Sequence, residues 1–143
     1  MFHMMRWSRP DILNSVRECS MMMSCTMESH IKVMKSIMRY AVTTEDRRLL
    51  LKPNAVWNGG RYFLFDMTGM SNSDYAKYDS KKSVSGWSTF LNGAKISFRI
   101  KLMPIIALSV AEHELFLVVM CAQDMLFVMR ILNIMGLKAK LTI

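Results

Sequence analysis

Two runs of alternating residues joined by Asn92–Gly93 constrain the fold more than any other part of this sequence. The runs are VSGWSTFL and AKISFRIK, and an Asn-Gly pair between such runs is the strongest short-range signal of a two-residue β-hairpin. The second run alternates apolar Ala94, Ile96, Phe98 and Ile100 with Lys95, Ser97, Arg99 and Lys101. The sequence therefore predicts a hairpin with one apolar face and one basic face.

One strand before the hairpin and one long helix after it complete the pattern. The aromatic run RYFLFDMTGMSNSDY indicates a strand with a bend or bulge at Gly69. Residues 109–135 are typical of a long apolar helix that begins at Ser109 and is closed by Gly136 as a C-cap. The segment LKAKLTI then starts a fourth strand. Strands and helices in this order predict an α/β domain.

Two helices are expected before the sheet. SRPDILNSVRECSMMMS carries Pro10 at a first-turn position, and TMESHIKVMKSIMRYAV has Thr26 and Ser29 as candidate caps. The second helix has one apolar face, made of Ile31, Met34, Ile37, Met38 and Ala41.

A stretch rich in Pro, Asn and Gly separates these helices from the strands. We therefore divide the chain into a helical segment, 1–52, a linker, 53–62, and a strand-bearing domain, 63–143.

Composition narrows the classes of partner. Apolar residues make up 52% of the chain and charged residues 21%, which excludes a disordered polypeptide. The net charge of +8 and the pI near 9.7 favour a polyanionic partner such as nucleic acid.

The apolar run of residues 115–136 is interrupted by Asp124 and Arg130. The remaining apolar pieces are shorter than the roughly 20 residues of a membrane span. We therefore expect a buried helix and no membrane partner.

The chain has 16 methionines, and Met clusters in some proteins bind Cu(I). Here pairs such as Met34 and Met38 recur at helical spacing, which is typical of packing in an apolar face. We interpret the methionines as packing residues.

The three cysteines give no CxxC pair, and Cys19, Cys25 and His30 match no compact zinc module. Free thiols and an N-terminus without an apolar h-region or small-residue cleavage site predict an intracellular protein.

Four motifs in order resemble one family. SRPDILNSV resembles T-R-P-D-I, and HIKVMKSIMRY resembles H-x-K-x-x-K-R-I-L-R-Y. SNSDYAKYDSKKSVSGWSTFLNGAKISF is similar to S-D-x-D-W-A-x-D…R-R-S-T-S-G-Y…L-G-G-x-x-I-S-W, and ALSVAEHELF to A-L-S-S-A-E-A-E-Y. Together they resemble the polyprotein of copia-type LTR retrotransposons, where reverse transcriptase passes into ribonuclease H. The resemblance implies a partial ribonuclease H-like domain preceded by two helices from the end of reverse transcriptase.

The resemblance also implies a metal site. Ribonucleases H cut the RNA of RNA–DNA hybrids with two Mg²⁺ or Mn²⁺ ions held by carboxylates. The family's first aspartate falls on Asn72, Asp74 lies two residues further, and the helix glutamate falls on Glu114. We read His113, next to it, as a surface residue and Glu112 as a first-turn residue. The family's later aspartates have no counterpart before Ile143, so we expect an inactive enzyme.

Three functions remain open at this point. One is an inactive retrotransposon fragment. Another is a weak nuclease that uses Asp74 and Glu114 with Mn²⁺. The remaining one is a binding module for RNA–DNA hybrid or other nucleic acid, with a basic surface made of Lys77, Lys81, Lys82, Lys95, Arg99 and Lys101. In each case an incomplete sheet is expected to leave an uncovered edge, through which the chain self-associates.

Overall fold

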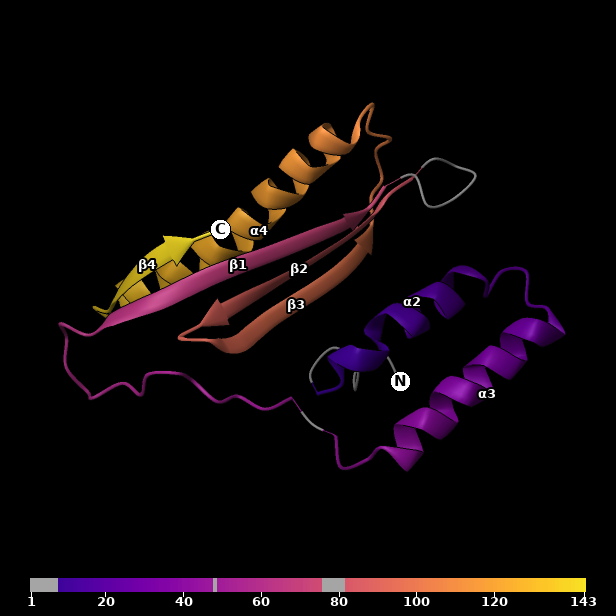
Figure 1. Ribbon diagram of the computed structural model, residues 1–143, viewed down its shortest axis with the longest axis horizontal. Coiled ribbons are helices and arrows are strands. Elements are labelled where there is room, and N and C mark those ends of the chain that lie inside the picture. Colours follow the sequence, from indigo (N-terminus) through magenta and orange to yellow (C-terminus); the bar gives the residue numbers. More distant parts are fainter. Residues whose placement is uncertain (1–7, 48, 76–81) are drawn as a thin grey trace. The chain divides into compact units, whose positions relative to one another are not determined.

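The computed structural model describes residues 8–47, 49–75 and 82–143. Two of the expected basic residues, Lys77 and Lys81, therefore lie outside the described residues. The chain divides into two compact units, Met1–Leu50 and Leu51–Ile143 (Figure 1). Each unit is described below by itself.

The first unit is a helical hairpin. A short 3₁₀ turn, η1 (Pro10–Ile12), leads into α2 (Leu13–Met21), and α3 (Glu28–Thr43) runs back beside α2 (Figure 1). Pro10 opens the first turn as predicted, because its fixed φ suits a helix start. The buried core of this unit is small, consisting of Ile12, Val16 and Ile37.

The cap of α3 differs from the prediction. Met27 is the N-cap residue, and its backbone N–H donates to Nδ1 of His30 at 3.1 Å. Thr26 instead donates its hydroxyl to the carbonyls of Met22 and Met23 in the preceding turn. The predicted apolar face of α3 is also mostly exposed, because Ile37 is its only fully buried member while Ile31 is 46% exposed.

The second unit is an α/β domain, as predicted. Its strands are β1 (Leu64–Asp74), β2 (Val84–Leu91), β3 (Ala94–Leu102) and β4 (Lys138–Thr142). The strand order is β3-β2-β1-β4, with β1 antiparallel to β2 and parallel to β4, so the sheet is mixed. The predicted Asn92–Gly93 turn joins β2 to β3 with φ of 49° and 80°, as a type I′ hairpin requires.

One face of the sheet is covered by α4 (Val110–Ile134) (Figure 1). The core between them consists of Phe65, Met67, Trp87, Leu117, Cys121, Met125, Leu132 and Leu137. We call the sheet face toward α4 the inner face and the opposite one the outer face.

Gly69 allows the close approach of α4 to β1. A Cβ at Gly69 would lie 2.6 Å from Sδ of Met125 and 2.7 Å from Sγ of Cys121. The pairing of β1 with β2 runs through Gly69 in register. The expected bend or bulge at this glycine is therefore wrong, and the glycine is needed for helix packing instead.

Both ends of α4 agree with the sequence. Ser109 is the N-cap and its hydroxyl accepts from the N–H of Glu112, while Gly136 follows the last turn with φ of 74°. The expectation of a buried helix is only partly correct. By length and composition α4 is long enough to cross a membrane, and only 22% of its most apolar stretch is buried.

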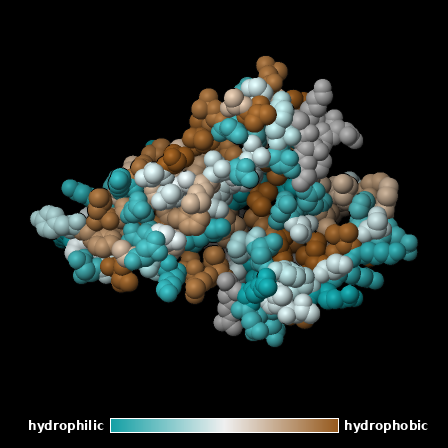
Figure 2. Space-filling view, viewed as in Figure 1, coloured by the Kyte–Doolittle hydropathy of each residue, from teal (hydrophilic) through white to brown (hydrophobic). Residues whose placement is uncertain are grey.

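The exposed side of α4 is apolar. Figure 2 shows hydrophobic side chains gathered over this helix. The exposed apolar residues of α4 include Leu115, Val118, Val119, Leu126, Phe127, Ile131 and Ile134. One side of α4 is therefore apolar and uncovered in this structure.

The segment expected as a linker is attached to the second unit. The N–H of Asn54 donates to the carbonyl of Asn92 at 2.6 Å, and the Asn92 amide donates to the carbonyl of Ala55 at 3.1 Å. The Trp57 ring lies 6.3 Å from the ring of Phe65. Residues 54–57 therefore contact the hairpin turn and the start of β1.

Candidate functional site

Asn72 and Asp74 lie near the end of β1, where the strand pairs with Gly86 and Val84 of β2. Successive side chains of a strand point to opposite faces. Met67 is buried under α4 on the inner face, so both Asn72 and Asp74 belong to the outer face, where they are exposed.

Glu114 lies in the first turns of α4 and is exposed. The neighbouring Glu112 has a structural role, because its carboxylate accepts from the N–H of Leu108 at 2.6 Å while its own N–H donates to Ser109. The carboxylate thus satisfies the N–H of the residue before the N-cap, and an anionic side chain there suits the positive end of the helix dipole. The expected first-turn role of Glu112 is confirmed.

These donors do not fit a two-metal site. Asn72 is neutral, so it offers a carbonyl oxygen without offsetting the charge of a cation. Asp74 shares the outer face with it, whereas Glu114 is carried by the helix on the inner side. Among the described residues there is no group of three or more His, Cys, Asp or Glu side chains placed to hold a metal ion.

The described members of the expected basic surface do not share one face. A register shift at Thr89/Phe90 leaves Ile96 without a partner, so that Phe90 pairs with Lys95 while Trp87 pairs with Arg99. Trp87 belongs to the inner face. The bulge therefore places Lys95 on the outer face and Arg99 and Lys101 on the inner one, which corrects the strict alternation expected of this strand.

Two of these cations also have partners within the protein. Nζ of Lys95 lies 5.4 Å from the centre of the Phe90 ring, a cross-strand cation–π contact. Nε of Arg99 donates to Oδ2 of Asp124 at 3.0 Å. Lys101 is exposed and Lys82 is half-buried.

Asp124 explains how a carboxylate is tolerated in the middle of α4. Its Oδ2 accepts from Nε1 of Trp87 at 2.8 Å as well as from Arg99. A buried indole N–H needs an acceptor, and the carboxylate supplies it. Asp124 therefore links α4 to β2 and β3.

His113 is fully buried, so its expected position at the surface is wrong. Its Nε2 lies 3.0 Å from Oγ of Ser85 on β2, and its ring lies 6.5 Å from that of Tyr75. Nδ1 is buried without a hydrogen-bond partner among the described residues. Helical geometry explains the burial, because His113 is four residues before Leu117 on the stripe of α4 that packs on the sheet.

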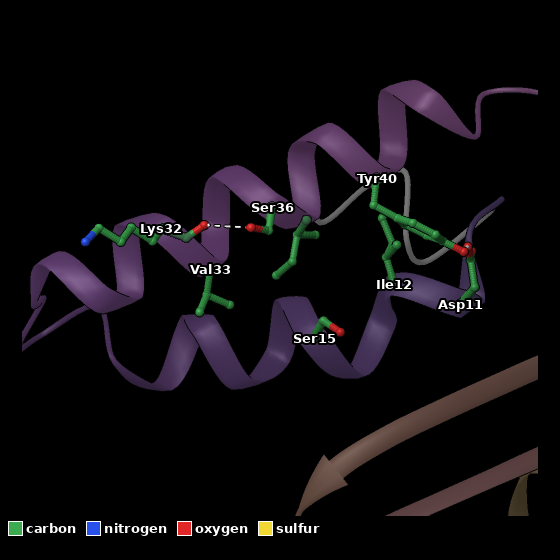
Figure 3. Close-up of a pocket in the computed structure, with 8 residues that line it drawn as sticks. Asp11, Ile12, Ser15, Lys32, Val33, Ser36 and Tyr40 are labelled. Carbon is green, nitrogen blue, oxygen red and sulfur yellow. Dashed lines mark hydrogen bonds between the residues drawn. The ribbon is translucent and has the colours of Figure 1, made fainter.

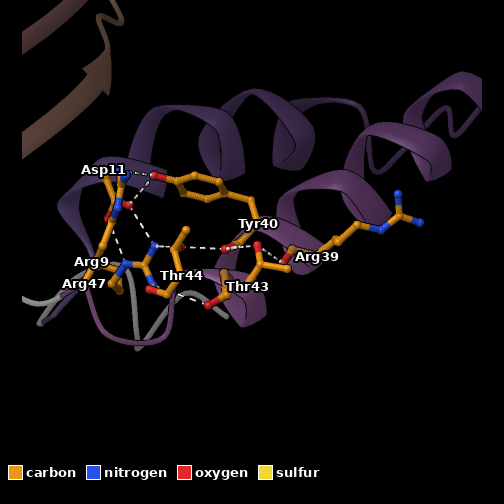
Figure 4. A network of polar contacts seen from close by, with 8 residues as sticks. Arg9, Asp11, Arg39, Tyr40, Thr43, Thr44 and Arg47 are labelled. Atoms are coloured by element: carbon orange, nitrogen blue, oxygen red, sulfur yellow. Dashed lines mark hydrogen bonds and ion pairs between the residues drawn. The ribbon is translucent and has the colours of Figure 1, made fainter.

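The sequence analysis missed a polar network in the first unit (Figure 4). Arg9 is 5% exposed and donates to both carboxylate oxygens of Asp11, at 3.0 and 2.8 Å. It also donates to the carbonyl and the hydroxyl of Thr44, each at 2.8 Å, just past α3. Tyr40 donates to Asp11 at 3.1 Å and receives a bond from Arg47.

This network is a clamp between the start of η1 and the end of α3, and we call it the Arg9 clamp. The hydrogen bond from Arg9 lowers the pKa of the Asp11 carboxyl below its ordinary value, and the same bond raises the pKa of Arg9. A cation at a helix C-terminus is also favoured by the helix dipole. The R-P-D order around a helix-starting proline is the signal that would have indicated the clamp.

A cleft of about 510 Å³ lies between α2 and α3 (Figure 3). Its lining is mainly apolar with polar groups at both ends: Asp11, Ile12, Ser15, Lys32, Val33, Ser36, Ile37 and Tyr40. The Asp11 carboxylate and the Tyr40 hydroxyl are already bonded in the Arg9 clamp, and Ser36 donates to the carbonyl of Lys32.

Two curated proteins are similar to this chain. One is the secreted RxLR effector protein 161 of Plasmopara viticola, 29% identical over 113 residues, which cover 78% of this chain and 74% of that protein. The other is the retrovirus-related Pol polyprotein from transposon TNT 1-94 of Nicotiana tabacum, 29% identical over 134 residues. That match covers 93% of this chain and 9% of the polyprotein. No protein-family model matches the chain, and no solved structure does. The similarity along nearly the whole chain indicates an origin in a retrotransposon polyprotein.

Proposed function

We propose that the chain is a catalytically inactive fragment of a copia-type retrotransposon polyprotein, comprising the end of reverse transcriptase and the first part of a ribonuclease H domain. The observation that carries this proposal is the similarity to the tobacco polyprotein over 93% of the chain. The mixed sheet with one long helix is consistent with a ribonuclease H-like fold.

The donors described above support the proposed loss of catalysis. A two-metal hydrolysis needs several carboxylates around one point, to offset the charge of both ions. Asn72 is neutral, and the described residues include no group of three or more His, Cys, Asp or Glu side chains placed to hold a metal ion. We therefore propose that the chain does not bind Mg²⁺ or Mn²⁺ tightly and that it acts, if produced, inside the cell as the polyprotein similarity favours.

Cleavage of a labelled RNA–DNA hybrid with Mg²⁺ tests this function, with an active ribonuclease H as the positive control. We expect no cleavage by the chain, and none by Asn72→Asp, because one restored carboxylate does not rebuild the set. A circular-dichroism spectrum confirms that both proteins are folded. Cleavage by the chain that Glu114→Gln abolishes would overturn the proposal and favour the weak nuclease.

A second candidate function is nucleic-acid binding without catalysis. The net charge of +8 favours it, as do exposed cations on both faces of the sheet, such as Lys101 on the inner and Lys138 and Lys140 on the outer face. Phosphate binding requires clustered cations and no carboxylates. Self-association through the exposed edge of β4 remains part of this proposal.

Fluorescence anisotropy with a labelled hybrid at increasing salt tests the binding function. We expect affinity to fall steeply with salt, and each lost phosphate contact to reduce the slope of log K against log salt by about one. Comparing Lys138→Ala/Lys140→Ala with Lys101→Ala shows which face binds. Absence of binding at low salt rules this function out.

A further inference from the structure

Many methionines of this protein do not pack in its core. Met67, Met103 and Met125 are fully buried, but Met22, Met23 and Met34 are 40%, 65% and 37% exposed. The interpretation of the methionines as packing residues is therefore wrong for the turn between α2 and α3. Thioethers at these positions bury little surface, so packing does not account for them. A thioether sulfur can also bind a soft metal ion.

The exposed sulfurs gather around one small cavity. It measures about 50 Å³ and is lined by Cys19, Met22, Met23, Thr26, His30, Ile31 and Met34. A cavity of this size has room for a few water-sized groups, since one water needs about 10–15 Å³ of it, and it is far below the roughly 300 Å³ of a small ligand pocket. It is large enough for a single ion. Four sulfur-bearing side chains from α2, the turn and α3 thus surround an ion-sized space, which we call the sulfur cavity.

The backbone fixes the residues that carry these sulfurs. The N–H of Met22 donates to the carbonyl of Cys19 at 3.2 Å, and that of Met23 to the carbonyl of Ser20 at 3.4 Å. Cys25 then donates its N–H to the carbonyl of Met22 at 3.2 Å. Successive hydrogen-bonded turns connect Cys19, Met22 and Met23, while Met34, which also lines the cavity, belongs to α3. A site whose ligands are held in advance loses less entropy on binding.

The chemistry of the lining selects the kind of ion. No carboxylate lines the sulfur cavity, so hard cations such as Mg²⁺ lack their oxygen ligands. Zn²⁺ prefers four thiolate or imidazole ligands. Here only Cys19 and His30 are of those types, and Nδ1 of His30 already accepts from Met27. One thiolate with thioethers is the donor set that suits Cu(I).

We propose that the sulfur cavity is a binding site for a soft monovalent cation of the Cu(I) class. Cys19 binds as the thiolate, with its proton released to solvent, and Met22, Met23 and Met34 supply thioether sulfurs. The thiolate charge offsets the single charge of the ion, so that the occupied site is neutral. Met21 takes no part, since its Sδ lies 3.2 Å from the Arg17 guanidinium, which donates to it.

Competition for Cu(I) against a chromophoric chelator, under anaerobic conditions, tests the site in the full chain. The variant Met22→Leu/Met34→Leu removes two sulfurs while conserving volume, which cores usually tolerate well. The matched control Met38→Leu/Met135→Leu changes two exposed methionines outside the cavity. We expect the first variant to bind Cu(I) roughly 100-fold more weakly. Mutating a residue that only supports a metal ligand already weakens binding by about 10–100-fold. We expect the control to bind like the parent.

Alkylation provides a second readout that needs no variant. Cys19 lines the sulfur cavity and the exposed Cys25, six residues on, does not. One equivalent of Ag(I), which has the same softness without redox chemistry, is expected to protect Cys19 from alkylation and leave Cys25 reactive. Equal protection of both cysteines, or equal Cu(I) affinity of the two methionine variants, means adventitious binding only and overturns the proposal.

Discussion

The two compact units of this chain are held together by different interactions. In the second unit, eight buried residues from β1, β2, α4 and the turn after α4 form one apolar core. Among the described residues of the first unit, the buried core consists of Ile12, Val16 and Ile37, and the Arg9 clamp joins the ends of the hairpin. Apolar burial dominates stability in most domains, whereas a partly exposed ion pair contributes little. We therefore expect the second unit to be the more stable one.

The two faces of the sheet in the second unit also differ. The inner face of the sheet keeps tight packing down to Gly69, where a single added carbon is too large. The outer face carries the neutral side chain of Asn72, where the ribonuclease H resemblance implies an aspartate. Under the proposed function, we expect this difference of a scaffold that keeps its packing and lacks a carboxylate needed for catalysis.

The largest expected effect is that of truncating the core of the second unit. Leu117 is 1% exposed at the centre of α4, and Leu117→Ala is expected to destabilise by about 2–5 kcal/mol through lost burial and a cavity. Denaturant unfolding followed by far-UV circular dichroism measures the change. Leu115→Ala on the exposed side of the same helix, 67% exposed, is the control and should lie within about 0.5 kcal/mol of the parent. Equal effects would show that α4 does not pack as described.

A smaller effect is expected from overpacking the inner face. Gly69→Ala places a methyl group 2.6 Å from Met125 and 2.7 Å from Cys121, and forced shifts of this kind cost about 1–3 kcal/mol. Gly86→Ala on the neighbouring strand is the control, because its nearest contacts of 3.8 Å are ordinary. The same unfolding experiment compares the two. A Gly69→Ala protein as stable as Gly86→Ala would argue against close approach of α4.

The Arg9 clamp predicts acid sensitivity of the first unit. Because the folded pKa of Asp11 is lowered from 3.8, its ionised form stabilises the fold above pH 3.8. That stabilisation is lost as the pH falls below 3.8 through the lowered pKa. We expect Asp11→Asn to be less stable than the parent at neutral pH and the difference to shrink in acid. Thermal melts at several pH values measure this, with Asp46→Asn as the exposed control. A difference independent of pH would exclude an ionic role for Asp11.

The smallest perturbation is chemical labelling of the three thiols. Cys25 is exposed, Cys19 is half-buried and Cys121 is buried. Burial raises the pKa of the Cys121 thiol, with a further contribution from Asp124, so its reactive thiolate is scarce. We expect alkylation in the order Cys25, Cys19, Cys121, read by mass spectrometry of the native chain. Fast labelling of Cys121 would mean that the inner face opens readily.

Features with strong local physics were predictable from the sequence. The Asn92–Gly93 turn needs positive φ at two positions, and the caps at Ser109 and Gly136 follow from the unpaired groups at helix ends. The α/β class followed from the order of these elements. Each of these depends on residues close together in the chain.

Features set by partners distant in sequence were not predictable. The bulge at Ile96 moves Lys95 to the outer face, and no pattern within the strand marks it. The buried ring of His113 has its polar partner in Ser85, 28 residues earlier, which helical spacing alone does not reveal. The role of Gly69 depends on the side chains of α4. The positions of Asn72 and Asp74 on the outer face and of Glu114 on α4 depend on long-range geometry too.

Native-state hydrogen exchange of the full chain, read by mass spectrometry, tests the central claim that the sheet and α4 form the stable core while the helical hairpin is weakly held. We predict that peptides from β1 and α4 exchange last. Those from α2 and α3 should exchange at least about tenfold faster, equivalent to about 1.4 kcal/mol, through local opening. Equal protection of α3 and β1 would contradict the account, because the two units would then open as one.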